Sequence, residues 1–149
     1  MCFGLYTPRT ERLNSLNINL DVAFEEIEIL RKRAMRFLEN GIELLEKNVL
    51  DIAAFNFQQF SELYLKFKLA EISGEYPKTH SIKRLLKELA KLTSTEEKVT
   101  NFLEENIDRI SNLENAYITS RYIPVEFERK EVENMKEMAE KLMKFVDLI

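Results

Sequence analysis

Apolar residues recur on two neighbouring faces of the segment from residue 50 to residue 73, and this pattern constrains the fold more than any other. Along one face they are spaced by four, three, four and three positions, which is the repeat of an α-helix. That row is Ala53, Phe57, Phe60, Tyr64 and Phe67, and the row beside it is Ile52, Phe55, Leu63 and Ala70. A helix with two apolar rows needs partners on more than one side. The segment is therefore predicted to be the central helix of an all-α protein.

Four further helices are predicted from the same spacing. They cover residues 21–47, residues 81–92, a long segment that starts after the capping-box pair Ser94 and Glu97 and ends near Arg121, and the C-terminal segment from about residue 132. Only three glycines and three prolines occur in the 149 residues, so few turns are available. The expected architecture is an up-and-down bundle of four long helices plus one short helix. It occupies residues 21–149, and residues 1–20 form an N-terminal extension.

Two glycines have predicted roles in this bundle. Gly74 is placed to end the central helix, and Pro77 disfavours its continuation into the loop. Gly41 lies inside the first helix, where it predicts a slight bend or a close approach of another helix.

Composition excludes several classes of function. The single cysteine, Cys2, cannot form an internal disulfide, and a single histidine, His80, cannot build a multi-histidine metal site. The sequence has no glycine-rich phosphate loop, no H-E-x-x-H and no G-x-S-x-G motif. A formal charge of -4 gives no overall attraction to nucleic acid. Because neither a signal-peptide pattern nor a membrane-length apolar run is present, we expect a cytoplasmic protein that needs no metal or other cofactor.

The central helix and the loop after it carry a specific series of residues. In chain order they are Ala54, Phe55, Gln58, Gln59, Glu62 and Lys66 on the helix, then Thr79, His80, Ser81 and Ile82 at the loop. This series resembles the A-F-x-x-Q-Q-x-x-E-x-x-x-K helix and the T-H-S/D-L loop of the HEPN family (higher eukaryotes and prokaryotes nucleotide-binding domains). The segment AYITSRYIP, residues 116–124, resembles the family's R-Y segment. The resemblance covers roughly residues 21–148.

This resemblance implies a function, but the sequence departs from the family pattern at the ribonuclease motif. Many HEPN proteins are homodimers with the fourth-helix region near the interface, and many are encoded beside a small nucleotidyltransferase as a toxin–antitoxin pair. Toxin members are metal-independent ribonucleases with an R-x(4–6)-H motif. Arg121 stands where that arginine is expected, but Glu126, Phe127 and Glu128 occupy the positions of the histidine. A carboxylate there would repel a phosphate and has the wrong acidity for acid–base work near neutral pH.

The sequence therefore predicts a non-catalytic HEPN-type homodimer that binds a nucleotide, a small nucleotidyltransferase partner, or both. The alternative is a metal-independent ribonuclease toxin of the HEPN class with a departed active site that uses Arg121. The aromatic residues Tyr117, Tyr122 and Phe127 also favour a homodimer, because they exceed what a small bundle readily covers.

Six residues are candidates for a ligand site: Gln59, Glu62, Lys66, His80, Arg121 and Tyr122. The first three share one face of the central helix, since they recur at i, i+3 and i+7. In one interpretation they line a groove in which Lys66 and Arg121 hold phosphate and Tyr122 stacks on a base. In the other, Glu62 and Lys66 form an ordinary i,i+4 ion pair and the glutamines tie the helix to the loop.

His80 also has two interpretations. It can pack or hydrogen-bond at the start of the helix at 81–92, with Thr79 or Ser81 as the cap, or it can contact a nucleotide. The basic residues around it are Lys78, Lys83, Arg84, Lys87 and Lys91. They form either a solvated helix face, which the overall acidity favours, or a nucleic-acid patch.

Overall fold

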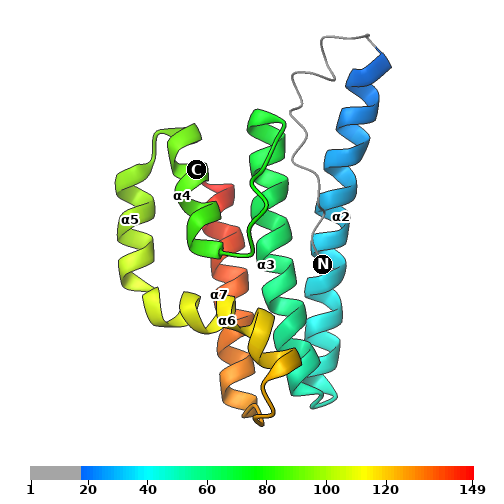
Figure 1. The fold of residues 1–149 in the computed structure, drawn as a ribbon, viewed down its shortest axis with the longest axis vertical. Helices are drawn as coiled ribbons and strands as arrows, with labels where there is room; N and C mark the ends of the chain where they lie inside the picture. The colour runs from blue at the N-terminus through cyan, green and yellow to red at the C-terminus, as the bar shows by residue number, and fades with distance from the viewer. Residues whose placement is uncertain (1–17) are drawn as a thin grey trace.

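The computed structural model describes residues 18–149, with side chains placed from residue 23 onward. This part of the chain forms six α-helices and no strand: α2 (Ile18–Glu46), α3 (Leu50–Ser73), α4 (Ile82–Thr93), α5 (Glu96–Glu105), α6 (Ile107–Tyr122) and α7 (Arg129–Asp147) (Figure 1). The all-α bundle is as predicted. Cys2 and most of the expected extension at residues 1–20 lie outside the described residues. None of the helices in residues 18–149 has the length and apolarity of a membrane span.

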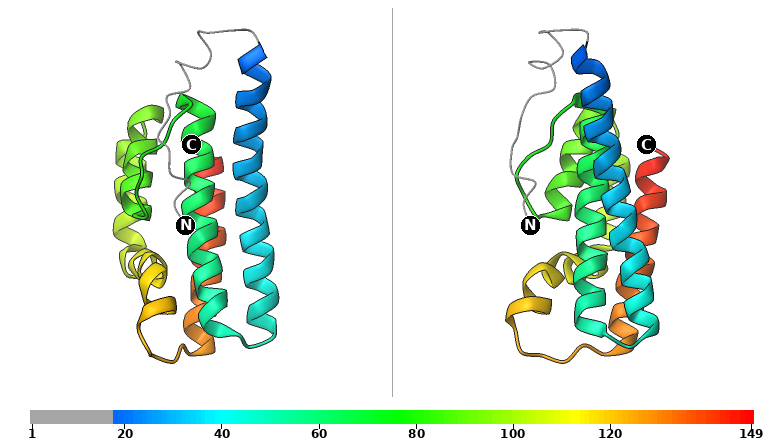
Figure 2. Two further views of the ribbon diagram at one scale, coloured as in Figure 1. Left: turned by 45° about the vertical axis from the view of Figure 1, so that its right-hand side comes forward. Right: turned by 90° about the vertical axis from the view of Figure 1, so that its right-hand side faces the viewer.

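The helix α3 is the centre of the bundle, as its two apolar rows predict. Every residue from Asn56 to Phe67 is buried. It packs against α2, α4, α6 and α7, and α2 and α7 run alongside it (Figure 2). Gly74 ends the helix with a left-handed φ of 82°, and its N–H donates to the carbonyl of Ala70 at 2.8 Å. The predicted bounds and the predicted stop at Gly74 are both confirmed.

The predicted fourth helix is two helices, α5 and α6, so the expected count of four long helices and one short helix is wrong. The break is at Asn106, whose φ of -123° is not helical. Its buried side chain donates to the carbonyl of Phe102 at 2.8 Å and accepts a hydrogen bond from Lys141 of α7 at 2.8 Å. These bonds compete with the helical ladder, as asparagine side chains commonly do, and α6 leaves in a different direction from α5 (Figure 1).

The predicted capping box at Ser94 and Glu97 is also wrong. Ser94 ends α4 in a left-handed conformation, with φ 56° and ψ 42°, and Thr95 precedes α5 without a capping side-chain hydrogen bond. A residue that closes one helix in this conformation is not in the extended geometry of an N-cap.

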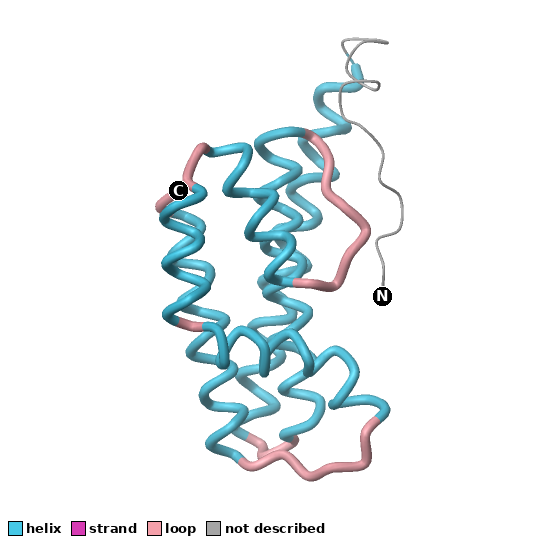
Figure 3. The backbone as a smooth tube through the Cα atoms, turned by 60° about the vertical axis from the view of Figure 1, so that its left-hand side comes forward, coloured by secondary structure: helices cyan, strands magenta, loops and turns pink. Residues whose placement is uncertain are grey.

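The connection between α3 and α4 returns along α3 before the next helix begins (Figure 3). From Glu62 to Gly74 the helix rises by about 18 Å. The six residues from Glu75 to His80 span about 20 Å when extended. The loop is therefore long enough to bring His80 back beside Glu62 in the middle of α3.

Gly41 marks a close approach of α2 and α3, which was one of the two predictions for this residue. A Cβ atom built on Gly41 would lie 2.7 Å from Cε1 of the Phe57 ring. Phe57 is fully buried, so its ring has little room to move away.

Replacement of Gly41 by alanine should lower the free energy of unfolding by about 1–2 kcal/mol, because the overlap with Phe57 outweighs the better helix propensity of alanine. Denaturant unfolding of Gly41→Ala and of the exposed control Glu39→Ala measures this difference. The further change Phe57→Leu should lower the free energy of unfolding less in Gly41→Ala than in the wild type, because the smaller side chain relieves the overlap with the new methyl group. Equal stability of Gly41→Ala and the wild type would contradict the close approach.

Candidate functional site

The middle of α3 carries a buried polar chain that we call the α3 charge network: Gln58, Gln59, Glu62, Lys66 and, from the loop, His80. The four helical members are at most 1% exposed. Gln59 Nε2 donates to Gln58 Oε1 at 2.7 Å, and Gln58 Nε2 donates to Glu62 Oε1 at 3.1 Å. Lys66 Nζ donates to Glu62 Oε2 at 2.9 Å. Glu62 is therefore the point at which the network converges.

His80 completes the network from outside α3. Its Nδ1 lies 2.9 Å from Glu62 Oε1, and its side chain is 31% exposed. Glu62, paired with the Lys66 ammonium, acts as a carboxylate and only accepts hydrogen bonds. The Nδ1 atom of His80 must then carry the hydrogen. The ring also stacks on Tyr117 of α6, with 4.0 Å between centroids and 19° between planes.

The loop that delivers His80 is fixed to the first turn of α4. Ser81 Oγ accepts a hydrogen bond from the Arg84 backbone N–H at 3.2 Å, and Thr79 Oγ1 accepts one from the Ser81 N–H at 3.1 Å. Ser81 is thus the N-cap of α4, as one interpretation predicted. Glu114 of α6 accepts a further hydrogen bond from the Lys83 N–H at 3.3 Å. The start of α4 therefore has contacts with both α3 and α6.

At the end of α6, three rings surround Arg121, and we call Phe55, Tyr117 and Tyr122 the aromatic clamp. The guanidinium carbon lies 4.9, 4.4 and 4.7 Å from their respective ring centroids. Arg121 Nε also donates to the carbonyl of Tyr117 at 3.0 Å. Arg121 is exposed, so the clamp fixes a cation at the surface.

The six predicted site residues fall into two groups. Gln59, Glu62, Lys66 and His80 form one hydrogen-bonded group, because Gln59 reaches Glu62 through Gln58 and both Lys66 and His80 bond to Glu62 directly. Arg121 and Tyr122 belong to the aromatic clamp. Tyr117 joins the groups, because the imidazole of His80 stacks on it and Arg121 lies over it. The sequence pattern predicts Tyr117 at a dimer interface and not at the ligand site, although its i,i+4 relation to Arg121 is visible in the sequence.

Burial divides these residues by what they can contact. Glu62 and Lys66 form the predicted i,i+4 pair, but at 1% exposure each it is a core ion pair and not an ordinary surface pair. A bound molecule outside the bundle can reach Arg121 and Tyr122, the latter being 67% exposed. None of the five network residues has a hydroxyl or thiol that could act as a nucleophile, and residues 23–149 contain no cluster of histidine, cysteine and carboxylate groups suited to a metal.

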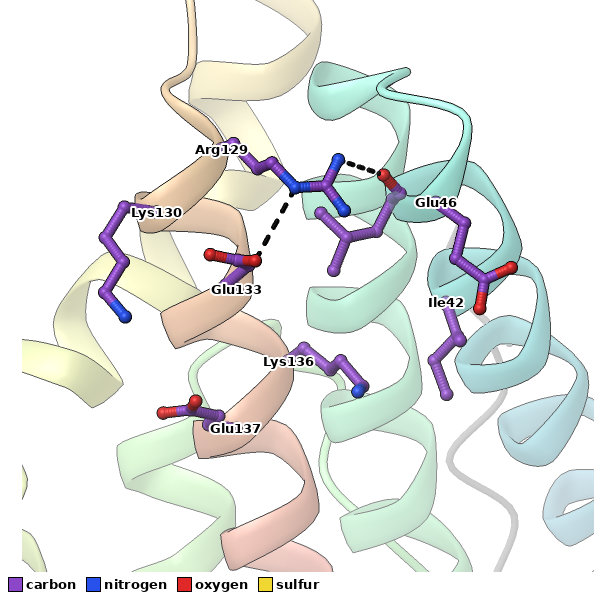
Figure 4. Close-up of a pocket in the computed structure, with 8 residues that line it drawn as sticks. Ile42, Glu46, Arg129, Lys130, Glu133, Lys136 and Glu137 are labelled. Carbon is purple, nitrogen blue, oxygen red and sulfur yellow. Dashed lines mark hydrogen bonds and ion pairs between the residues drawn. The ribbon is translucent and has the colours of Figure 1, made fainter.

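A separate hollow of about 300 Å³ lies between the end of α2 and the start of α7 (Figure 4). Its lining residues are Ile42, Leu45, Glu46, Arg129, Lys130, Glu133, Lys136 and Glu137. Cationic and acidic side chains are present in equal numbers, so the hollow favours neither charge. Arg129 donates to the carbonyl of Leu45 at 2.8 Å, near the negative end of the α2 dipole. This contact ties α7 to α2, and no predicted site residue is involved.

Comparisons with known proteins agree with the architecture. The family model described as HEPN domain matches residues 27–149. A crystal structure of an archaeal HEPN homologue is similar with a TM-score of 0.56 and 21% sequence identity, over 81% of this chain and 94% of that chain. At this identity the structural similarity shows the fold alone. No curated protein matches the sequence.

Replacement of Glu62 by glutamine should lower the free energy of unfolding by about 3–5 kcal/mol, because the buried Lys66 ammonium loses its counter-charge. Chemical denaturation measures this cost. The matched control is Glu43→Gln, since Glu43 and Lys47 are also an i,i+4 pair but have side chains 61% and 65% exposed. That control should cost less than about 1 kcal/mol.

The added change Lys66→Met should restore part of the stability lost in Glu62→Gln, because no buried charge then remains unpaired. Equal effects of Glu62→Gln and Glu43→Gln would contradict a core ion pair.

Proposed function

Because the chain belongs to the HEPN domain family, we propose that it is a non-catalytic member that forms a homodimer and binds a nucleotide, a small nucleotidyltransferase partner, or both. The observation that carries this proposal is the state of Arg121. It is fixed at the surface by the aromatic clamp, while the segment from Tyr122 to Glu128 contains no histidine. A positioned cation without an acid–base partner is suited to holding an anion and not to cleaving a phosphodiester.

The position of His80 supports the same proposal. His80 is the one histidine of the sequence, and its Nδ1 is committed to Glu62 while its ring is stacked on Tyr117. It is placed by α3 and α6 together, upstream of the position that the ribonuclease members use. In the alternative, a ribonuclease with a departed active site, Arg121 would act without a histidine partner, because His80 precedes it in the chain and cannot complete the R-x(4–6)-H motif.

An exposed apolar surface supports the homodimer. It lies at the end of α6 and in the following loop, and we call it the α6 patch: Ile118, Ile123 and Val125. These side chains are 54%, 46% and 52% exposed. Three large apolar side chains so close in sequence are suited to burial against a second copy, whose identical patch supplies the same chemistry.

A nucleotide would bind beside the same end of α6 in this proposal. Arg121 would meet a phosphate oxygen and Tyr122 would stack on the base. The buried residues Gln59, Glu62 and Lys66 would support the site from the core, because their hydrogen bonds hold His80 and the α3–α4 loop in place. Their role is to position the surface and not to touch the ligand.

The wild type should sediment as a dimer at about micromolar concentration, since an apolar patch of this kind is buried in stable interfaces. The variant Ile123→Glu should dissociate it, because a carboxylate would be buried against the partner. The control Ile72→Glu introduces the same charge at a residue that is also exposed (47%) but lies at the end of α3. A monomeric wild type at that concentration would exclude the homodimer.

Calorimetric titration with ATP and related nucleotides should give binding heat with the wild type and a weaker affinity, by about tenfold or more, with Arg121→Gln, because a charge-assisted contact is lost. The control Arg84→Gln removes the same charge from α4 and should leave the affinity unchanged. The absence of heat with every nucleotide would count against the nucleotide proposal and leave the dimer proposal standing.

Purified protein should not cleave single-stranded RNA in the presence of a chelator, because no histidine follows Arg121 at the required spacing. Gel analysis of labelled RNA tests this. Cleavage that is lost in Arg121→Ala and kept in His80→Ala would establish the ribonuclease alternative instead.

A further inference from the structure

The solvent-facing side of α4 concentrates positive charge in a protein that is acidic overall. Residues 78–91 contain five cationic side chains and one acidic residue, Glu88, whereas the whole chain has a formal charge of -4. Such local asymmetry commonly marks a surface for a charged partner. The proposed dimer and nucleotide site do not use it.

Three of these cations lie on one helical face, which we call the α4 basic face: Arg84, Lys87 and Lys91. Their spacing of i, i+3 and i+7 places them on one side of α4, and all three are exposed. The opposite side is the core face, where Ile82, Leu85, Leu86 and Leu89 are buried. Packing against the bundle therefore fixes the direction in which the α4 basic face points.

Few negative charges of the protein neutralise this face. Lys91 forms a 3.4 Å ion pair with Glu88, and their side chains are 67% and 39% exposed respectively. Within residues 23–149, Arg84 and Lys87 have no ion pair to a carboxylate. Exposed lysine and arginine side chains need no partner for stability, so the concentration of charge is available for association.

The shape of the surroundings favours a compact acidic partner over an extended polyanion. From Arg84 to Lys91 the basic face is only about 10 Å long. The neighbouring helix α5 packs against α4 and carries exposed carboxylates at Glu96, Glu97, Glu104 and Glu105. A nucleic-acid strand that continued past the cations would approach these carboxylates and be repelled. Leu92 is 45% exposed at the end of the face. It offers an apolar contact to a partner side chain, whereas a phosphate backbone has no apolar group to place there.

We propose that the α4 basic face docks an acidic amphipathic helix of a partner protein, with Arg84, Lys87 and Lys91 facing its carboxylates and Leu92 facing one of its apolar side chains. In Figure 1 the α6–α7 loop lies at the lower end of the bundle, whereas α4 runs upward from its contact with α6. Lys91 and Leu92 at the upper end of α4 are therefore the part of the docking surface farthest from this loop.

The test uses a fluorescently labelled, side-chain-stapled helical peptide of roughly eight residues with two Glu-Glu-Leu-Glu repeats, so that its helix is about as long as the basic face. Its two leucines are four positions apart and share one helical face. Fluorescence anisotropy should show binding to the wild type that weakens from about 50 mM to about 300 mM salt. The triple variant Arg84→Glu, Lys87→Glu, Lys91→Glu should lower the affinity by about tenfold or more. The matched control Lys98→Glu, Lys130→Glu, Lys144→Glu changes the net charge equally at scattered exposed lysines and should stay within about threefold of the wild type. Leu92→Ser should weaken binding even at the higher salt concentration.

A labelled single-stranded RNA of about 16 nucleotides serves as the competing probe. The proposal is overturned if the wild type does not bind the peptide, if both triple variants lose the same affinity, or if the RNA binds more tightly than the peptide and loses affinity in the α4 variant alone. Circular dichroism checks that each variant is folded. If the glutamate triple variant unfolds, glutamine replaces glutamate at positions 84, 87 and 91 and also at positions 98, 130 and 144 of the control, and the same criteria apply.

Discussion

The carboxylate of Glu62 is the interaction on which the rest of the site depends. It lies in the fully buried centre of α3 and accepts hydrogen bonds from three side chains: Gln58, Lys66 and His80. A buried carboxylate is costly unless its charge is balanced and its oxygens are bonded. Lys66 supplies the charge from the same helix. His80 comes from the α3–α4 loop, so satisfying Glu62 also fixes the path of that loop.

The path of the loop in turn fixes the positions of the start of α4 and the end of α6. Ser81 caps α4 directly after His80, and the His80 ring stacks on Tyr117. Tyr117 in turn contributes to the aromatic clamp that holds Arg121 at the surface. A chain of short contacts therefore connects a charge in the core of the bundle to the exposed cation that the proposed function requires. Figure 3 shows the loop that makes this connection possible.

Local patterns predicted the elements that depend on local interactions. The bounds of α3 follow from its apolar rows and from Gly74, and the cap of α4 is Ser81, one of the two hydroxyl residues predicted for it. The break at Asn106 was not predictable in this way, because the apolar spacing continues across it and Lys141, which bonds to it, is 35 residues away. The contact between Glu62 and His80 spans 18 residues and depends on the loop doubling back along α3. Sequence reasoning identified both residues but could not establish their bond.

The most direct test of this account is the protonation of the His80 ring, measured by the nitrogen-15 chemical shifts of its two ring nitrogens in labelled protein at neutral pH. Because Glu62 acts as an acceptor, we expect Nδ1 to carry a hydrogen in the wild type, and we expect this signature to be lost in Glu62→Leu if that variant remains folded. A neutral His80 protonated on Nε2, with an unprotonated Nδ1, would contradict a carboxylate that positions the loop through this histidine.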